Sequence, residues 1–69
     1  MNIEEMQVNL NAYGFENFKI YERTGEWAAI DVQDKNESEI ISCIERLRSF
    51  GLQVEQWEHY IEIYIEKEN

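Results

Sequence analysis

Glu55, His59 and Glu62, in the last third of the chain, are candidates for acid–base catalysis or for binding a metal ion. Two carboxylates that face each other can share a proton or hold a hard cation, and a histidine exchanges protons near neutral pH. However, no serine or cysteine can be placed beside His59 from the sequence, and one histidine with one cysteine is too few for a zinc site. We therefore expect no catalytic residues, no metal and no cofactor. An enzyme or metal protein built on these three residues is the weakest hypothesis.

Aromatic and acidic side chains alternate with isoleucines in residues 59–66, and this stretch organises the rest of the chain. The isoleucines at positions 61, 63 and 65 fall on one side of an extended backbone. The other side carries Tyr60, Glu62, Tyr64 and Glu66. This alternation predicts a half-buried antiparallel strand with an apolar face toward a core and an aromatic, acidic face away from it.

Two helices are predicted from capping residues and apolar spacing. Asn2 with Glu5, and Asn36 with Glu39, have the spacing of a capping box, although Ser38 is a rival cap for the second helix. The apolar stripes that follow are Ile3, Met6, Leu10 and Tyr13 in the first helix and Ile40, Cys43, Ile44, Leu47 and Phe50 in the second. A glycine follows each stripe, so we expect helices over about 3–13 and from about 37 to 50. Cys43 is then a core thiol.

Two hairpins complete the pattern. Residues 15–22 alternate, and a three-residue loop at 23–25 would pair Glu22 with Glu26 and place Tyr21 beside Trp27. The second hairpin turns near residues 58 and 59, or through a loop of residues 57–60, and either turn places Glu55 opposite Glu62.

These elements predict an α+β fold of one domain, residues 1–69, with the order α-β-β-α-β-β. Four mostly antiparallel strands would form one sheet, and both helices would cover one of its faces. The αββ pattern occurs twice, in residues 2–33 and 36–66, which indicates either an internal repeat or two similar solutions to one folding problem.

Charge limits the classes of partner. Fifteen acidic residues against six basic ones give a formal net charge of −9, which disfavours direct binding to nucleic acid or to an anionic membrane. The sequence has no apolar run long enough to span a membrane and no signal-peptide pattern. With a single cysteine and therefore no internal disulfide, we expect a cytoplasmic protein.

The sheet face away from the helices is the candidate partner-binding surface. By strand parity it carries aromatic residues, which commonly anchor protein interfaces, interleaved with carboxylates. Its predicted members are Tyr21, Trp27, Asp31, Glu55, Trp57, Tyr60, Glu62, Tyr64 and Glu66. Glu55 directly opposite Glu62 is unfavourable unless a cation relieves it, and Lys19 and Arg23 offset part of the charge nearby.

The leading hypothesis is a small acidic module that docks on a basic surface of a partner protein. In its sharpest form it is an inhibitor whose carboxylates replace nucleic-acid phosphates on a DNA- or RNA-handling enzyme. Phage proteins that inhibit bacterial defence, anti-CRISPR proteins among them, share this size and acidity, which is an analogy and no motif match. The alternatives are a structural or accessory protein that homodimerises through this face or an edge strand, and a face that is only solvated.

Overall fold

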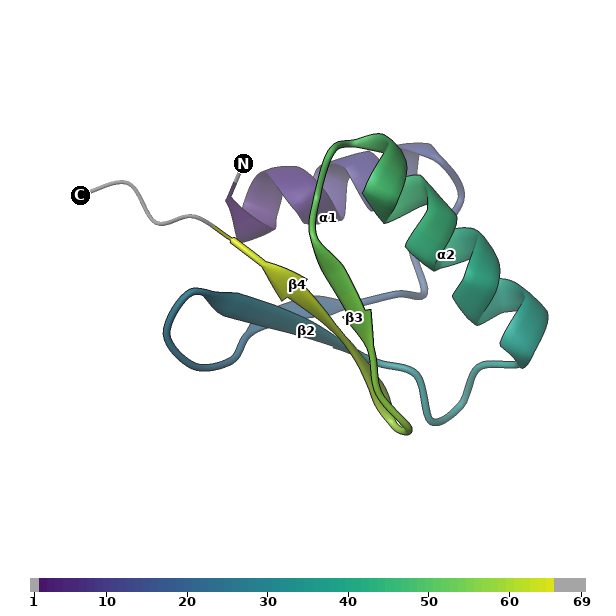
Figure 1. Ribbon diagram of the computed structural model, residues 1–69. Coiled ribbons are helices and arrows are strands. Elements are labelled where there is room, and N and C mark those ends of the chain that lie inside the picture. Colours follow the sequence, from purple (N-terminus) through teal and green to yellow (C-terminus); the bar gives the residue numbers. More distant parts are fainter. Residues whose placement is uncertain (1, 66–69) are drawn as a thin grey trace.

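The computed structural model describes residues 2–65, which form two helices and four strands in the predicted order (Figure 1). These elements are α1 (Ile3–Ala12), β1 (Ile20–Glu22), β2 (Trp27–Asp31), α2 (Glu37–Ser49), β3 (Val54–Gln56) and β4 (Tyr60–Tyr64). The strands form one sheet in the order β1-β2-β4-β3, and every neighbouring pair is antiparallel. Both helices lie on one side of this sheet, which confirms the α+β architecture. The internal repeat stays a prediction.

Both helices begin at the predicted caps. The Asn2 side chain accepts a hydrogen bond from the Glu5 amide at 2.8 Å, and Asn36 accepts one from the Glu39 amide at 2.8 Å. The Glu39 carboxylate accepts in return from the Asn36 amide, so the second helix has a complete capping box and Ser38 is not its cap. In both helices the asparagine therefore fixes the start, as the sequence spacing predicts.

The core lies between the helices and the sheet face that they cover, which we call the covered face. Its fully buried large side chains include Met6, Leu10, Ile30, Cys43, Leu47, Ile61 and Ile63. Most strand residues among them are β-branched, and such side chains pack well on a pleated surface. Cys43 is a core thiol as predicted, and burial raises its pKa to about 12.

The first hairpin differs from the prediction in its register. Ile20 lies opposite Ile30 and Glu22 opposite Ala28, two positions away from the predicted pairs. The reason is a longer loop that includes Glu26: the Arg23 amide donates to the Trp27 carbonyl at 3.0 Å, and the Trp27 amide donates to the Thr24 carbonyl at 3.1 Å. A shift of two residues keeps every side chain on its predicted face, because side chains alternate with a period of two.

The first strand is also shorter than predicted, because residues 15–19 do not join the sheet. The Phe15 amide donates to the Leu10 carbonyl, and the Phe18 amide donates to the Phe15 carbonyl, so the chain turns here. The rings of Phe15 and Phe18 meet edge to face at 5.6 Å, and Phe18 is buried in the core. The alternating pattern there reflects burial in a turn and not an extended strand.

The second hairpin has the predicted register. Val54 lies opposite Ile63 and Glu55 opposite Glu62. The Trp57 amide donates to the Tyr60 carbonyl at 2.9 Å around the turn at residues 58 and 59.

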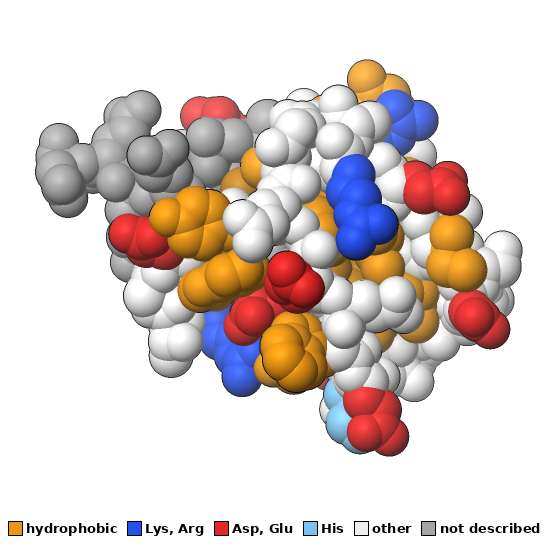
Figure 2. Space-filling model, viewed as in Figure 1, with side chains coloured by type: hydrophobic (Ala, Val, Ile, Leu, Met, Phe, Trp, Pro, Cys, Tyr) orange, Lys and Arg blue, Asp and Glu red, His pale blue; other side chains and the backbone are white. Residues whose placement is uncertain are grey.

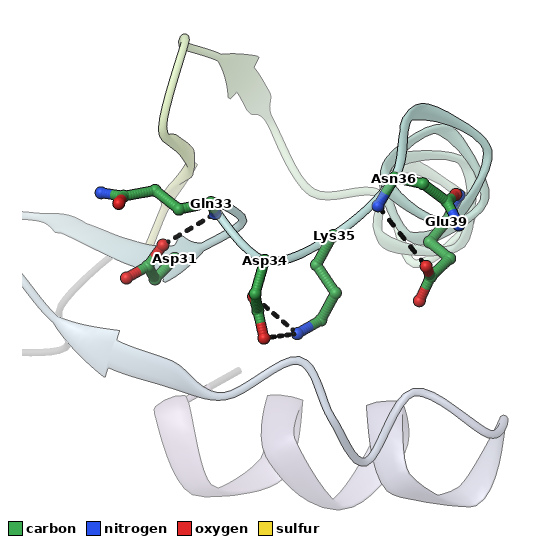
Figure 3. A network of polar contacts seen from close by, with 6 residues as sticks. All are labelled: Asp31, Gln33, Asp34, Lys35, Asn36 and Glu39. Carbon is green, nitrogen blue, oxygen red and sulfur yellow. Dashed lines mark hydrogen bonds and ion pairs between the residues drawn. The ribbon is translucent and has the colours of Figure 1, made fainter.

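Polar contacts within the chain fix the connection from β2 to α2 (Figure 3). The Asp31 carboxylate accepts from the Gln33 amide at 2.9 Å, and the Lys35 ammonium lies 2.9 Å from Asp34. The Lys35 ammonium also lies 5.1 Å from the centre of the Phe18 ring, so its stem covers the core. The same ion pair lowers the pKa of Asp34.

Helix side chains contact both edge strands of the sheet. Gln7 of α1 accepts from the Ile20 amide at 2.9 Å and donates to the Phe18 carbonyl at 3.2 Å, as a neighbouring strand would. Arg48 of α2 donates to the Val54 carbonyl at 3.4 Å on the other edge. Such contacts hinder further strands from pairing there.

Neither helix of residues 2–65 has the length and apolar character of a membrane-spanning segment.

Candidate functional site

The sheet face away from the helices, which we call the open face, displays the predicted site residues together. Because Ile20, Ala28, Ile61, Ile63 and Val54 point into the core, their strand neighbours must point the other way. The strands place on the open face Tyr21, Trp27, Ala29, Asp31, Glu55, Tyr60, Glu62 and Tyr64, and the Trp57 ring, stacked on Tyr60, lies with them. Glu66, also predicted for this site, lies outside the described residues. Ala29 was not predicted.

Aromatic pairs lie at two ends of the open face. Trp27 is opposite Tyr64, and their rings meet edge to face with centroids 5.3 Å apart. The predicted neighbour of Trp27 was Tyr21, but the shifted register places Tyr21 opposite Ala29 instead. At the other end the rings of Trp57 and Tyr60 are stacked, 6.2 Å apart and inclined by 20°.

Two acidic residues lie side by side between these aromatic pairs, on β4 and β3. Ala29 lies opposite Glu62, and Glu62 lies opposite Glu55, so two carboxylates meet on neighbouring strands as predicted. Figure 2 shows side chains of both kinds, hydrophobic in orange and acidic in red, next to one another over the strands. The open face thus combines apolar area with negative charge.

Arg23 relieves the contact between the two glutamates. Its guanidinium lies 2.9 Å from the Glu62 carboxylate and 4.3 Å from the centre of the Tyr60 ring. The interaction with the Tyr60 hydroxyl, and after it the charge of Glu62, raises the pKa of Arg23. The sequence indicated that Arg23 offsets charge in this region, but not which carboxylate it would contact.

Ala29 makes this contact sterically accessible. Arg23 follows β1 and its two partners are on β4, so the arginine must cross β2, which lies between them. Ala29 is the β2 residue directly beside Glu62, and its small side chain has no exposed surface. A larger residue at this position would occupy the path of the guanidinium.

Glu26 also contacts the open face, which the sequence analysis did not predict. Its carboxylate accepts a hydrogen bond of 2.5 Å from the Tyr64 hydroxyl. Because Glu26 lies in the first hairpin loop, this bond joins the loop to β4 and holds the Tyr64 ring beside Trp27.

Exposure and pairing decide which groups could meet a partner. Trp57 and Tyr21 keep 53% and 47% of their surface exposed, and Glu55 is exposed. The Glu62 side chain is only 17% exposed and is already paired. The negative charge available to a partner is therefore at the margins of the open face and not at its centre.

The residues considered for acid–base or metal chemistry do not form a cluster. His59 lies 3.9 Å from Glu58 in the turn, whereas Glu62 is bound by Arg23. Within residues 2–65 no group of three or more histidine, cysteine or acidic side chains is placed to hold a metal ion.

Comparison of the chain with protein-family models, with curated proteins and with solved structures finds no match in any of the three.

Proposed function

We propose that this chain is an acidic protein-binding module that docks on a basic surface of a partner protein through its open face. The observation that supports the proposal most is the exposure of Trp57 and Tyr21 on a sheet face that also carries carboxylates. Tryptophan and tyrosine contribute strongly to protein interfaces because they bury a large area at a small cost in side-chain entropy. The helices leave this face uncovered.

Charge favours a basic partner. The net charge of −9 attracts a positively charged surface at long range and speeds the encounter. Many basic protein surfaces bind nucleic acid, and carboxylates can occupy the positions that phosphates take there. The sharper form of the proposal is thus an inhibitor that competes with DNA or RNA for a nucleic-acid-handling protein. No catalytic step is part of the proposal.

A capture experiment with two matched variants tests the proposal. The open-face variant combines Tyr21→Ser, Glu55→Lys and Trp57→Ser. The control variant combines Val8→Ser, Ile41→Ser and Glu45→Lys, which alters exposed apolar and acidic residues of the helices and changes the net charge equally. Each protein is immobilised, exposed to a bacterial lysate, and washed at low and then high salt.

We expect the wild type and the control variant to retain a basic protein that high salt releases, and the open-face variant to lose it. DNA or RNA should then displace the purified partner from the wild type. Capture by all three proteins alike would contradict the proposal. So would a wild type that retains no protein and sediments as a dimer, a result that would favour homodimerisation through the same face.

A further inference from the structure

We propose that Trp57 and Glu55 form the site on the open face that binds an arginine side chain of the partner. This inference deepens the proposed function, on which it rests. In this site the guanidinium of the partner would stack on the Trp57 ring and pair with the Glu55 carboxylate.

The neighbouring strand shows how this surface binds a guanidinium. On β4, Tyr60 and Glu62 are two residues apart and therefore on one face of the strand. Arg23 occupies this aromatic–carboxylate pair, with its guanidinium over the ring at 4.3 Å and beside the carboxylate at 2.9 Å. A guanidinium is planar, so it stacks on an aromatic ring and can offer two N–H groups to one carboxylate, whereas a lysine ammonium is a compact point charge.

The same pair of residue types occurs next to it. Glu55 and Trp57 are also two residues apart: Glu55 is in β3, and Trp57 follows the end of that strand, where the chain enters the turn. Glu55 lies directly opposite Glu62, and the Trp57 ring is stacked beside Tyr60. Each member of the occupied pair thus has a counterpart of its own type at the edge of the sheet.

The second pair is accessible. Among residues 2–65, no ion pair and no cation–ring contact places a cation on Glu55 or Trp57; Arg23 is bound to β4, Lys35 to Asp34 and Arg46 to Tyr13. Trp57 is 53% exposed, and β3 is an edge strand. A side chain from another protein can therefore reach the ring and the carboxylate together.

Electrostatics also favours a second arginine here. Among the described residues Arg23 pairs with Glu62 and not with Glu55, so no ion pair of residues 2–65 places a cation on Glu55, which lies opposite Glu62. A guanidinium on Trp57 would be attracted by the ring and by Glu55, and it would extend the existing row of Arg23, Tyr60 and Trp57. The ring and the carboxylate together therefore favour arginine at this site, whereas the net charge would attract lysine and arginine alike.

Peptide binding tests the proposal. The probes are hexa-arginine and hexa-lysine, which carry equal charge, and the protein carries Trp27→Phe so that Trp57 is its only tryptophan. We expect hexa-arginine to change the Trp57 emission and to bind about two- to fivefold more tightly than hexa-lysine. Glu55→Gln should lower the affinity for hexa-arginine about two- to fivefold, whereas Glu45→Gln, with the same change of charge on α2, should have a clearly smaller effect.

Trp57→Leu keeps an apolar side chain without an aromatic ring, and in calorimetry it should remove the preference for arginine. Circular dichroism verifies that each variant is folded. Equal affinity for the two peptides, or equal losses in Glu55→Gln and Glu45→Gln, would overturn the inference. Its failure is separable from that of the proposed function, because the lysate capture depends on the whole open face and on no particular cation.

Discussion

The two faces of the sheet are made by the same strands, yet they differ in composition and in exposure to solvent. The covered face is aliphatic and buried, with Ile30, Ile61 and Ile63 fully enclosed. The open face carries rings and charges, and its contacts include an ion pair, a stacked pair of rings and a hydrogen bond from Tyr64 to Glu26. The covered face encloses the core, whereas the open face leaves aromatic area and charge exposed.

The difference shows where the chain's acidity is placed. No charged side chain is among the buried residues of the part that the structure describes, so the negative charges lie on surfaces. On the open face Arg23 neutralises the central glutamate, while Glu55 at the edge stays exposed. Contacts within the open face therefore hold its aromatic rings in place, while the charge of Glu55 at the edge stays exposed.

Truncation on each face provides the largest contrast. Ile61→Ala removes a side chain with no exposed surface and should lower the free energy of unfolding by about 2–5 kcal/mol. Tyr21→Ala removes a ring that is 47% exposed and should cost clearly less. Urea denaturation followed by circular dichroism measures both. Similar losses from the two variants would mean that the open face contributes to folding as much as the covered face does.

The edge of the sheet at β1 provides a second test, because the Gln7 side chain of α1 covers it. Gln7→Leu removes the hydrogen bonds to the Ile20 amide and the Phe18 carbonyl. We expect a loss of about 1–3 kcal/mol in unfolding free energy, and self-association that rises with concentration as the edge opens. Val8→Ala, at an exposed neighbouring position, is the control. A monomeric Gln7→Leu protein of unchanged stability would show that the side chain does not protect this edge.

The ion pair within the open face should have a smaller effect. Arg23→Met keeps an apolar stem but leaves Glu55 and Glu62 opposite each other without a cation. We expect a small fall in melting temperature that is larger at low salt, because salt screens the repulsion between the two glutamates. Combining this change with Glu62→Gln should restore most of the loss. A fall that is the same at all salt concentrations would mean that packing of the Arg23 stem, and not its charge, stabilises the face.

The smallest expected effect is a gain in stability, and it comes from a change at Glu55. Glu55→Gln removes one of two facing carboxylates and should raise the free energy of unfolding by about 0.2–1 kcal/mol at low salt. The same change should weaken binding of a basic partner. Thermal melts of the variant, compared with Glu45→Gln, measure the first effect. A destabilised Glu55→Gln protein would indicate that Glu55 serves the fold and not a partner.

Local patterns predicted much of this structure. The asparagine caps are read from a spacing of three residues, and the register of the second hairpin follows from a short turn and alternating isoleucines. The same parity placed Trp27, Trp57 and Tyr64 on one face. These features depend on residues close together in the chain, which is why the sequence alone determines them.

Contacts between distant segments could not be predicted. The pairing of β2 with β4 sets the strand order, and only that order brings Arg23 to Glu62 across Ala29. Gln7 reaches the Ile20 amide because α1 packs beside β1, a placement that the apolar stripe of the helix does not specify. The predicted register of the first hairpin was wrong because the loop is longer, closed by hydrogen bonds from the Arg23 amide to the Trp27 carbonyl and from the Trp27 amide to the Thr24 carbonyl.

NMR can locate the docking surface residue by residue, through the chemical-shift changes that follow when hexa-arginine is added to the ¹⁵N-labelled protein. If the open face is the docking surface, the changes will cluster at the backbone amides of β3, β4 and β2 and at the indole of Trp57. They will spare the acidic first turns of α1 and α2, where Glu4, Glu5, Glu37 and Glu39 lie. Changes that follow acidic residues over the whole surface, helices included, would contradict the account and reduce the open face to one part of a generally acidic protein.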